Sequence, residues 1–435
     1  MAMPIRQHAS GNRDRLRPDA RQGTQVPRNP HDKRRALIAG AGIGGLAAAL
    51  ALSRAGFLVD VFERAPALEE VGAGLQIPPN ASGILADLGV LHRLEGKALE
   101  PDCLRVRSGA SGAQLMTMPL GREARLRWDH PMLVAHRADL QQALVDAVAQ
   151  DINIHLELGA PITGLSVEGA RVSLQTQQGG ETLTETGDLL VGADGAHSLI
   201  RRAAGLGGRK AGYAGRVAWR ALIPASDAPA FARTKETALW LGAKTHLVHY
   251  PLRGGTLINI VAITEDEWRG DDDNFWSSQG DARELLRAFR DWDSSARKLL
   301  DAVQDWRRWP LLDAEPLKRW SAGPVTLLGD AAHPMLPFFA QGAAQAIEDA
   351  GALGAAFMPR GWQEISITRG LADYERKRRA RATRIQTASR KQGMIYHLAG
   401  PAALVRDMGM RALPPDMVMA RFDWLYDDQR GAFFT

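Results

Sequence analysis

The sequence predicts an α/β fold in which a parallel sheet covered by helices is combined with a mostly antiparallel sheet and a helical C-terminal part. Residues 36–63 have the order strand, glycine-rich turn, helix, strand, which is typical of a βαβ unit. Residues 216–263 alternate between apolar and polar positions over several short stretches, as antiparallel strands do. Residues 325–350 give a further strand, loop and helix, and roughly the last hundred residues are helical in pattern.

The composition is that of a globular protein of two or three domains. The chain has 435 residues, of which 45% are hydrophobic and 24% charged. No apolar run approaches the ~18 residues that a membrane span needs, so we expect no membrane partner. Cys103 is the only cysteine, which excludes an internal disulfide and a metal site built from cysteines. We therefore expect no metal and a cytoplasmic location.

The basic isoelectric point comes from the N-terminus. Residues 1–35 carry nine Lys or Arg and three Asp, a net +6, so the chain total of +5 leaves −1 for the rest. The body is near neutral, and we expect no nucleic-acid partner. Residues 1–33 are polar without apolar periodicity and are predicted to be a disordered extension. Three acids argue against a transit peptide, and a signal-peptide core is missing.

The first βαβ unit predicts a dinucleotide site. Gly40 permits a tight turn, Gly42 lets a pyrophosphate approach the backbone, and Gly45 lets the helix pack closely. Glu63 ends the second strand about 20 residues beyond Gly42, where a carboxylate binds ribose hydroxyls. This context predicts an adenine dinucleotide and leaves NAD and FAD both open.

Three residues that lie in sequence between the first βαβ unit and the predicted antiparallel strands have competing interpretations. Gln76 lies in a predicted loop, where it either bonds to backbone or contacts a ligand. Arg137 opens a helix, a position that the helix dipole disfavours for a cation, so it is either a surface arginine or the partner of an anion. Asp194 follows a buried strand at residues 188–192, and capping of the next helix is a sufficient explanation of it.

The predicted antiparallel strands carry the polar side chains Arg220, His246, His249 and Tyr250. His246 and His249 are three residues apart and face opposite sides of a strand, which is not a metal-binding pattern. Most strand histidines are structural, so each is a weak candidate for catalysis. Residues 282–309 are predicted to be helical, and the basic run at residues 375–391 is interpreted as a solvated helix face.

The stretch at residues 325–350 offers a ligand two kinds of group. A buried strand ends at Asp330, and a helix begins at Gly342 after a loop with Pro334 and Pro337. A carboxylate at the strand end and unpaired N–H groups at the helix start suit a bound molecule. An ordinary crossover connection is the alternative.

Four motifs in this order resemble a known family. GAGIGG with Glu63, HRADL around Arg137, GADGAHSLIRR and GDAAHP together resemble the class A, single-component flavoprotein aromatic hydroxylases, over about residues 34–435. Salicylate, 3-hydroxybenzoate and 6-hydroxynicotinate monooxygenases are the most similar members. The resemblance implies the fold of p-hydroxybenzoate hydroxylase. It places an FAD-binding domain at 34–103, 132–213 and 318–400, a substrate-binding sheet domain at 104–131 and 214–317, and a helical segment at 401–435.

The resemblance also implies site residues. Those expected to bind FAD are Gly40, Gly42, Ile43, Gly45, Glu63, Arg64, Arg137, Asp194, Asp330, Gly342, Ala343 and Ala344. Those expected to line the substrate pocket are Gln76, Trp219, Pro337, Phe339 and Gln341. The candidates for catalysis are His249, Tyr250 and Arg220, with His246 as a further possible base and Arg253 as a further carboxylate ligand. Some pyridine hydroxylases of this group have a histidine at the position of Gln76, and a glutamine cannot act as that base.

The implied activity is hydroxylation of a small aromatic ring. Tightly but non-covalently bound FAD, reduced by NADH or NADPH, would react with O2 to a C4a-hydroperoxide and oxidise a hydroxybenzoate- or hydroxypyridine-carboxylate-like substrate. The expected assembly is a monomer or homodimer. The alternatives are a flavin epoxidase or drug-modifying monooxygenase of the same fold, and a flavin redox sensor without turnover.

Overall fold

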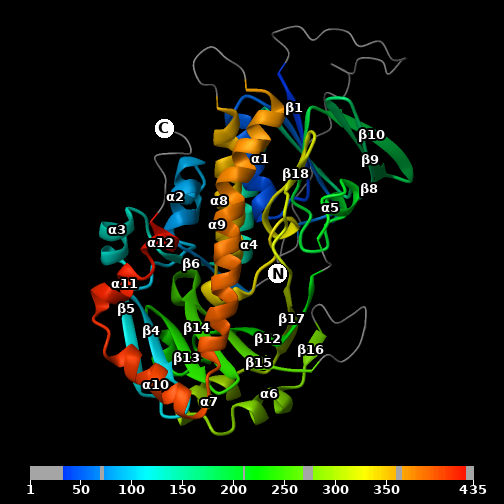
Figure 1. Ribbon diagram of the computed structural model, residues 1–435. Coiled ribbons are helices and arrows are strands. Elements are labelled where there is room, and N and C mark those ends of the chain that lie inside the picture. The colour runs from blue at the N-terminus through cyan, green and yellow to red at the C-terminus, as the bar shows by residue number, and fades with distance from the viewer. Residues whose placement is uncertain (1–32, 69–72, 209–210, 268–277, 359–364, 428–435) are drawn as a thin grey trace. The chain divides into compact units, whose positions relative to one another are not determined.

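The computed structural model describes residues 33–68, 73–208, 211–267, 278–358 and 365–427. All helices and strands named below lie in the unit Arg34–Thr435 (Figure 1). The predicted extension at residues 1–33 lies outside the described residues, apart from Lys33. No helix in the described part of the chain is long and apolar enough to cross a membrane.

A six-stranded sheet carries the glycine-rich turn. Five of its six strands run parallel, and the short strand β18 pairs antiparallel with β19 at one edge. In spatial order the strands are β18 (Ser321–Ala322), β19 (Val325–Leu327), β11 (Leu189–Gly192), β1 (Arg35–Ala39), β2 (Leu58–Glu63) and β7 (Ile154–Leu158). In the middle of the sheet, residues 36–39 of β1 and 189–192 of β11 are apolar and buried because both faces of a parallel sheet are covered.

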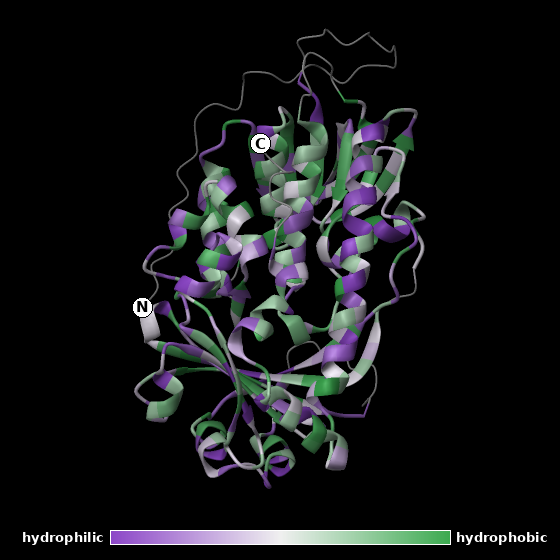
Figure 2. Ribbon diagram, turned by 60° about the vertical axis from the view of Figure 1, so that its left-hand side comes forward, coloured by the Kyte–Doolittle hydropathy of each residue, from purple (hydrophilic) through white to green (hydrophobic). Residues whose placement is uncertain are grey.

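Helices cover this sheet in layers. Helices α1 (Ile43–Arg54) and α4 (Arg137–Ala149) pack on its strands, α8 (Gly342–Phe357) packs on α1, and α2 (Pro79–Asp87) and the long α9 (Ile367–Tyr396) pack on α8. Helices α1 and α8 approach so closely that a Cβ on Gly354 would lie 2.8 Å from the Ala51 backbone oxygen. Figure 2 shows hydrophobic and hydrophilic residues mixed along the helices, as expected when one side packs and the other meets water.

The antiparallel strands predicted at residues 216–263 belong to an eight-stranded sheet, in which most strand pairs are antiparallel. In spatial order its strands are β16 (Ser278–Gly280), β17 (Trp306–Asp313), β12 (Gly212–Pro224), β15 (Leu257–Glu265), β14 (Thr245–Leu252), β13 (Glu236–Gly242), β4 (Cys103–Ser108) and β5 (Gln114–Pro119). Only the β13–β4 pair is parallel among the described pairs of this sheet. One face packs on α6 (Ala282–Ala288) and α7 (Ser294–Asp301), and the other faces the parallel-sheet region.

Two smaller sheets and short helices complete the described elements. They are β8 (Ile162–Glu168), β9 (Arg171–Gln178), β10 (Glu181–Gly187), the pair β3 (Gly74–Ile77) and β6 (Leu133–His136), α3 (Arg122–Trp128), α5 (Leu199–Ala203), α10 (Gly400–Arg411), α11 (Pro415–Ala420) and α12 (Asp423–Tyr426). The α/β fold class is thus confirmed, while the predicted domain boundaries stay predictions.

Two local predictions were wrong. Gln76 lies in strand β3 and not in a loop, because β3 pairs with β6. Residues 306–309 belong to β17 and not to a helix, because they pair with β12 and the following Pro310 does not suit a helix interior.

Candidate flavin and substrate site

A cavity of about 380 Å³ lies where the parallel strands end. Gly42 follows β1, Ala193 and Gly195 follow β11, and Gly329 and Asp330 follow β19, and all of these line it. Strands β12, β14 and β15 of the other sheet form the opposite wall. Ligands of open α/β sheets bind at this carboxyl edge of the strands.

The glycine-rich turn forms one end of the cavity. Gly40 has φ 103°, and a Cβ on Gly45 would lie 2.0 Å from the Gly40 oxygen, so neither position accommodates a side chain. Gly42 has open space beside it and lines the cavity. Helix α1 begins directly after it, with no side-chain cap and no acid in its first turn. Its free N–H groups and dipole therefore favour an anion at this point.

Glu63 is fixed beside the same turn. Its two carboxylate oxygens accept hydrogen bonds from the backbone N–H groups of Ala41 at 2.9 Å and Ala65 at 3.0 Å. It does not line the cavity, and the neighbouring Arg64 is exposed. Glu63 thus holds its carboxylate at the end of β2, next to the turn that a dinucleotide would contact.

Helix α8 directs a second N-terminus at the cavity. Its N-cap residue, Gln341, makes no side-chain cap, and the first described intrahelical bond runs from the Gln345 N–H to the Gln341 carbonyl. Gly342 and Ala343 line the cavity, and Gly342 has open space beside it. The cavity therefore lies between two uncapped helix starts, each with a positive potential.

A buried ionic cluster anchors α8. Glu348 and Asp349 both pair with Arg378 of α9, and Arg381 also pairs with Glu348. Asp349 in addition accepts the Gly329 N–H at 3.0 Å and contacts His333 Nε2 at 2.6 Å. Burial by itself would raise the pKa of Glu348, but Arg378 and Arg381 lower it to about 2. The cluster ties the loop around Gly329 and the start of α8 to one rigid framework.

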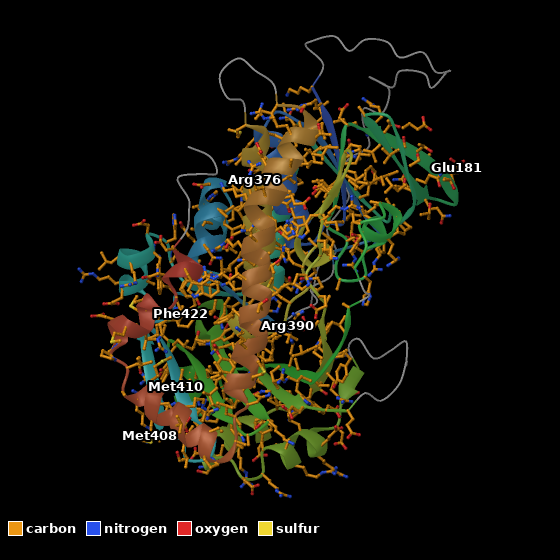
Figure 3. All side chains as sticks on the ribbon, in the orientation of Figure 1. Glu181, Arg376, Arg390, Met408, Met410 and Phe422 are labelled. Carbon is orange, nitrogen blue, oxygen red and sulfur yellow. The ribbon has the colours of Figure 1, made fainter. Side chains whose placement is uncertain are left out.

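The arginines of α9 differ in their surroundings. Arg376 and Arg390, labelled in Figure 3, pair with Asp373 and Asp313 nearer the surface. Arg378 is buried. The prediction that the basic run is a solvated face was therefore wrong at Arg378, because its two carboxylate partners lie about 30 residues earlier in the chain and were not associated with it.

The sheet wall of the cavity carries Arg220 and Tyr250. Burial lowers the pKa of Arg220, which Tyr250 partly offsets and Arg137 reinforces. Its Nε atom has no hydrogen-bond partner, and it forms no ion pair with a carboxylate of the described residues. Burial also raises the pKa of the Tyr250 hydroxyl, so that this group stays protonated. A half-buried guanidinium with a buried, unpartnered Nε, beside a second cation, favours an anionic ligand.

His246 lines the same wall. Burial lowers its pKa well below the usual value, and His397 and Arg216 add to this, so the ring is neutral at pH 7. Its Nδ1 atom lies 2.7 Å from Nε2 of His397. The other ring nitrogen, Nε2, is left for a molecule in the cavity.

Comparison with known proteins identifies the family. The model of the FAD binding domain family matches residues 33–389 of this chain. The chain belongs to this family of FAD-binding proteins. FAD is its cofactor, and the resemblance deduced from the motifs is confirmed.

Similar proteins include named hydroxylases. A 3-hydroxybenzoate 6-hydroxylase of Polaromonas naphthalenivorans (strain CJ2) is 35% identical over 90% of this chain and 95% of its own length. A 6-hydroxynicotinate 3-monooxygenase of Bordetella bronchiseptica is 33% identical over 82% of this chain and 91% of its own. Among solved structures, a salicylate hydroxylase substrate complex has 26% identity and a TM-score of 0.77, covering 92% of this chain and 97% of its own.

A second similar structure contains a ligand with a different ring system. HpxO of Klebsiella pneumoniae, complexed with FAD and uric acid, has 26% identity and a TM-score of 0.79, covering 92% of this chain and 98% of its own. The described residues of this flavoprotein fit FAD, because both helix starts and the open glycines 42 and 342 face one cavity. No group of three or more His, Cys, Asp or Glu within the described ranges is arranged to hold a metal ion.

The structure brings eleven of the predicted site residues together. Those that line the flavoprotein's cavity are Gly42, Ile43, Gln76, Arg137, Arg220, His246, Tyr250, Asp330, Pro337, Gly342 and Ala343. Gly40, Gly45, Glu63 and Arg64 lie behind or beside the glycine turn, and Ala344 is buried within α8. Asp194 caps α5 through the N–H groups of Leu199 and Ile200.

Two predicted site residues, Trp219 and His249, lie on the face of the sheet that points away from the cavity. His249 accepts a hydrogen bond from Trp240 Nε1 at 3.1 Å, and Trp219 donates one to Thr264 at 3.0 Å. Both residues lie outside the cavity lining, and Trp219 and Trp240 belong to the core on the side of α6 and α7. Side chains alternate along a strand, so Arg220, His246 and Tyr250 face the cavity while Trp219 and His249 face away.

Three further candidates are engaged elsewhere. Phe339 packs against Phe422 and Trp424, with ring centroids 6.3 and 6.4 Å away. Gln341 is buried and accepts hydrogen bonds from Asn80 and Gln345. Arg253 is held by both oxygens of Asp139, at 2.9 and 3.0 Å, which removes it as the free carboxylate ligand.

Sequence reasoning missed several apolar lining residues: Leu75, Val248, Val261 and Ile263. Period-two alternation would have found Val248, because it lies between His246 and Tyr250 on β14. The others come from elements whose contact with the cavity depends on tertiary packing.

Proposed function

We propose that this FAD-dependent monooxygenase hydroxylates a small aromatic carboxylic acid of the hydroxybenzoate or hydroxypyridine type. Arg220 is the observation that carries this proposal, because a half-buried guanidinium, with an unpartnered Nε and no carboxylate partner among the described residues, faces the cavity that the start of α8 also lines. NADH or NADPH and O2 are the proposed co-substrates. The cytoplasm, where nicotinamides are available, is the proposed location.

FAD is proposed to span the cavity between the two helix starts. The first turn of α1 at Gly42 and Ile43 binds the pyrophosphate, and Glu63 binds the adenosine ribose. Asp330 accepts a hydrogen bond from a hydroxyl of the ribityl chain. Gly342 and Ala343 direct N–H groups at the pyrimidine edge of the flavin, where reduction places negative charge. Bound in this way, the flavin supplies the activation of O2 and the transfer of one oxygen atom to the ring.

Arg137 is proposed to contact the same cofactor. Its side chain is exposed on the cavity wall and forms no ion pair with a described residue. A flavin phosphate would provide the anion that this helix-start position lacks.

The substrate is proposed to lie against the eight-stranded sheet. Arg220 binds its carboxylate through two parallel hydrogen bonds, a geometry that fits a guanidinium and a carboxylate. The Tyr250 hydroxyl, which stays protonated, donates to the same end of the substrate. Val248, Val261 and Ile263 give this wall an apolar surface that excludes water from the reacting ring.

His246 is proposed as the base for the ring hydroxyl. The ring is neutral, lines the cavity and has Nε2 free to accept a proton. Removing this proton makes the ring electron-rich, as oxygen transfer to it requires. Gln76 lines the same cavity but has no basic group, so we assign it a hydrogen-bonding role only.

Substrate-dependent oxidation of a nicotinamide tests the proposal. Purified protein carrying FAD is mixed with NADH or NADPH and with 3-hydroxybenzoate, salicylate or 6-hydroxynicotinate, and products are identified by mass spectrometry. We expect at least one acid to stimulate oxidation and to gain one oxygen atom. A flavoprotein that consumes the nicotinamide at the same rate with and without every acid, and forms no hydroxylated product, would contradict the proposal.

A further inference from the structure

Two histidines and a glutamate connect the substrate wall with the surface. His246 of β14 contacts His397, the residue that ends α9, through Nδ1 and Nε2 at 2.7 Å. The Nδ1 atom of His397 lies 3.6 Å from an oxygen of Glu265, at the end of β15. His246 and His397 are 3% and 7% exposed, whereas the Glu265 side chain is 38% exposed. The three groups form one row from the cavity to solvent.

The pair has a feature that a purely structural contact does not explain. His397 Nδ1 is buried and has no hydrogen-bond partner, although buried polar atoms are nearly always paired. An oxygen of the Glu265 carboxylate lies 3.6 Å away, just beyond hydrogen-bond range. A shift of the Glu265 side chain by about 1 Å would close that gap to a normal hydrogen bond. The row is thus complete except for its last, movable contact.

Charges around His397 favour its neutral form. Burial, and after it the charges of Arg216 and Arg406, lower the pKa of His397 to about 4. Arg216 lies 3.9 Å from Glu265, opposite it on the neighbouring strand, and Arg406 is paired with Asp407. Both rings are therefore neutral, and each can accept a proton at one nitrogen and release one from the other.

We propose that His246, His397 and Glu265 form a proton relay that carries the substrate's hydroxyl proton to solvent. This inference rests on the proposed function. The ring hydroxyl gives its proton to Nε2 of His246, and Nδ1 of His246 releases its own proton to Nε2 of His397. Nδ1 of His397 then gives a proton to Glu265, which exchanges it with water. One proton enters and one leaves, both rings end neutral, and the substrate keeps the negative charge.

The reverse transfer resets the relay. Each imidazole finishes with its proton on the other nitrogen, and return of one proton to the product restores the starting tautomers. His397 acts through His246 and touches no substrate, so it positions and empties the base. Its loss should slow the proton step and leave the binding of the acid nearly unchanged.

Proton release on substrate binding tests the relay. His397→Gln keeps an acceptor for the Nδ1–H of His246 but cannot pass a proton on, and Glu265→Gln removes the final acceptor. Glu267→Gln, two residues further along and exposed, is the matched control. FAD content and thermal unfolding show that each variant is folded. A pH indicator in a stopped-flow instrument then measures proton release as 3-hydroxybenzoate, or the acid found active, is mixed with oxidised holoenzyme.

We expect His397→Gln and Glu265→Gln to slow proton release and kcat about 10-fold, with KM changed less than twofold. The solvent isotope effect on kcat should rise, and raising the pH until the free substrate ionises should restore the rate. Glu267→Gln should match the wild type. Wild-type proton release in His397→Gln would overturn the relay. A wild-type enzyme that hydroxylates none of the acids would overturn the proposed function instead, so the two failures are distinguishable.

Discussion

Replacing Arg220 by glutamine tests the substrate site in a way that separates binding from folding. Arg220 is half-buried on the cavity wall, its Nε is unpaired, and desolvation lowers its pKa. Hydrogen bonds to a charged group contribute about 1.5–3 kcal/mol each. Two such bonds to a substrate carboxylate, at the lower value, give about 3 kcal/mol, or a loss of roughly 150-fold in affinity at 25 °C.

The same change should leave the free protein as stable as before, or more stable. A buried Nε without a partner in a partly desolvated cation costs free energy, and a neutral glutamine removes the cost of the charge. We therefore expect the midpoint of thermal unfolding to stay equal or rise while carboxylate binding is lost. A loss of stability parallel to the loss of binding would mean that Arg220 has a structural partner.

Two ligands make the assay specific. Perturbation of the flavin absorbance gives the Kd of 3-hydroxybenzoate and of phenol, which lacks the carboxylate. Arg220→Gln should weaken the acid about 150-fold and change phenol less than threefold, and Arg220→Lys should recover only part of the loss because lysine lacks the planar fork. Equal weakening of both ligands would refute the assignment of Arg220 to the carboxylate.

Gly42→Val should abolish FAD binding without unfolding the protein, because Gly42 has φ −70° and open space beside it, whereas Gly45→Val should prevent folding, since its Cβ would lie 2.0 Å from the Gly40 oxygen. The ratio of flavin to protein absorbance checks the first and circular dichroism the second; normal FAD content in Gly42→Val would count against the cofactor position. Burial lowers the pKa of His249 to about 4, below the ~6.5 of the unfolded chain. The unfolded state then binds more protons between these values, so stability is full above about pH 6.5 and falls as the pH drops toward 4. Urea unfolding across this range should show a smaller fall in His249→Gln, and an unchanged slope would contradict the buried neutral ring.

Local sequence patterns predicted the glycine turn, the strand-end acid and the helix start beside the cavity. The turn at Gly40–Gly45 and the acid at Glu63 are close in sequence, and their spacing reflects fixed backbone geometry. The uncapped start of α8 at Gly342 was also readable, because a strand end, a proline-containing loop and a helix pattern follow one another.

The substrate side could not be predicted as well, since it depends on long-range packing. The alternation of β14 was evident, but the sequence did not tell which alternate face meets the cavity, so His246 and His249 were both candidates and only His246 faces it. The burial of Arg378 depends on Glu348 and Asp349 of another helix. His397 carried no local signal, because its contact with His246 joins it to a strand more than a hundred residues earlier.

A crystal structure with FAD and 3-hydroxybenzoate bound is the most direct test of the account. It should show one FAD reaching from the N–H groups of Gly42 and Ile43 to those of Gly342 and Ala343, with the carboxylate of the acid hydrogen-bonded to Arg220. A flavin ring away from the start of α8, or an acid bound without contact to Arg220, would contradict it.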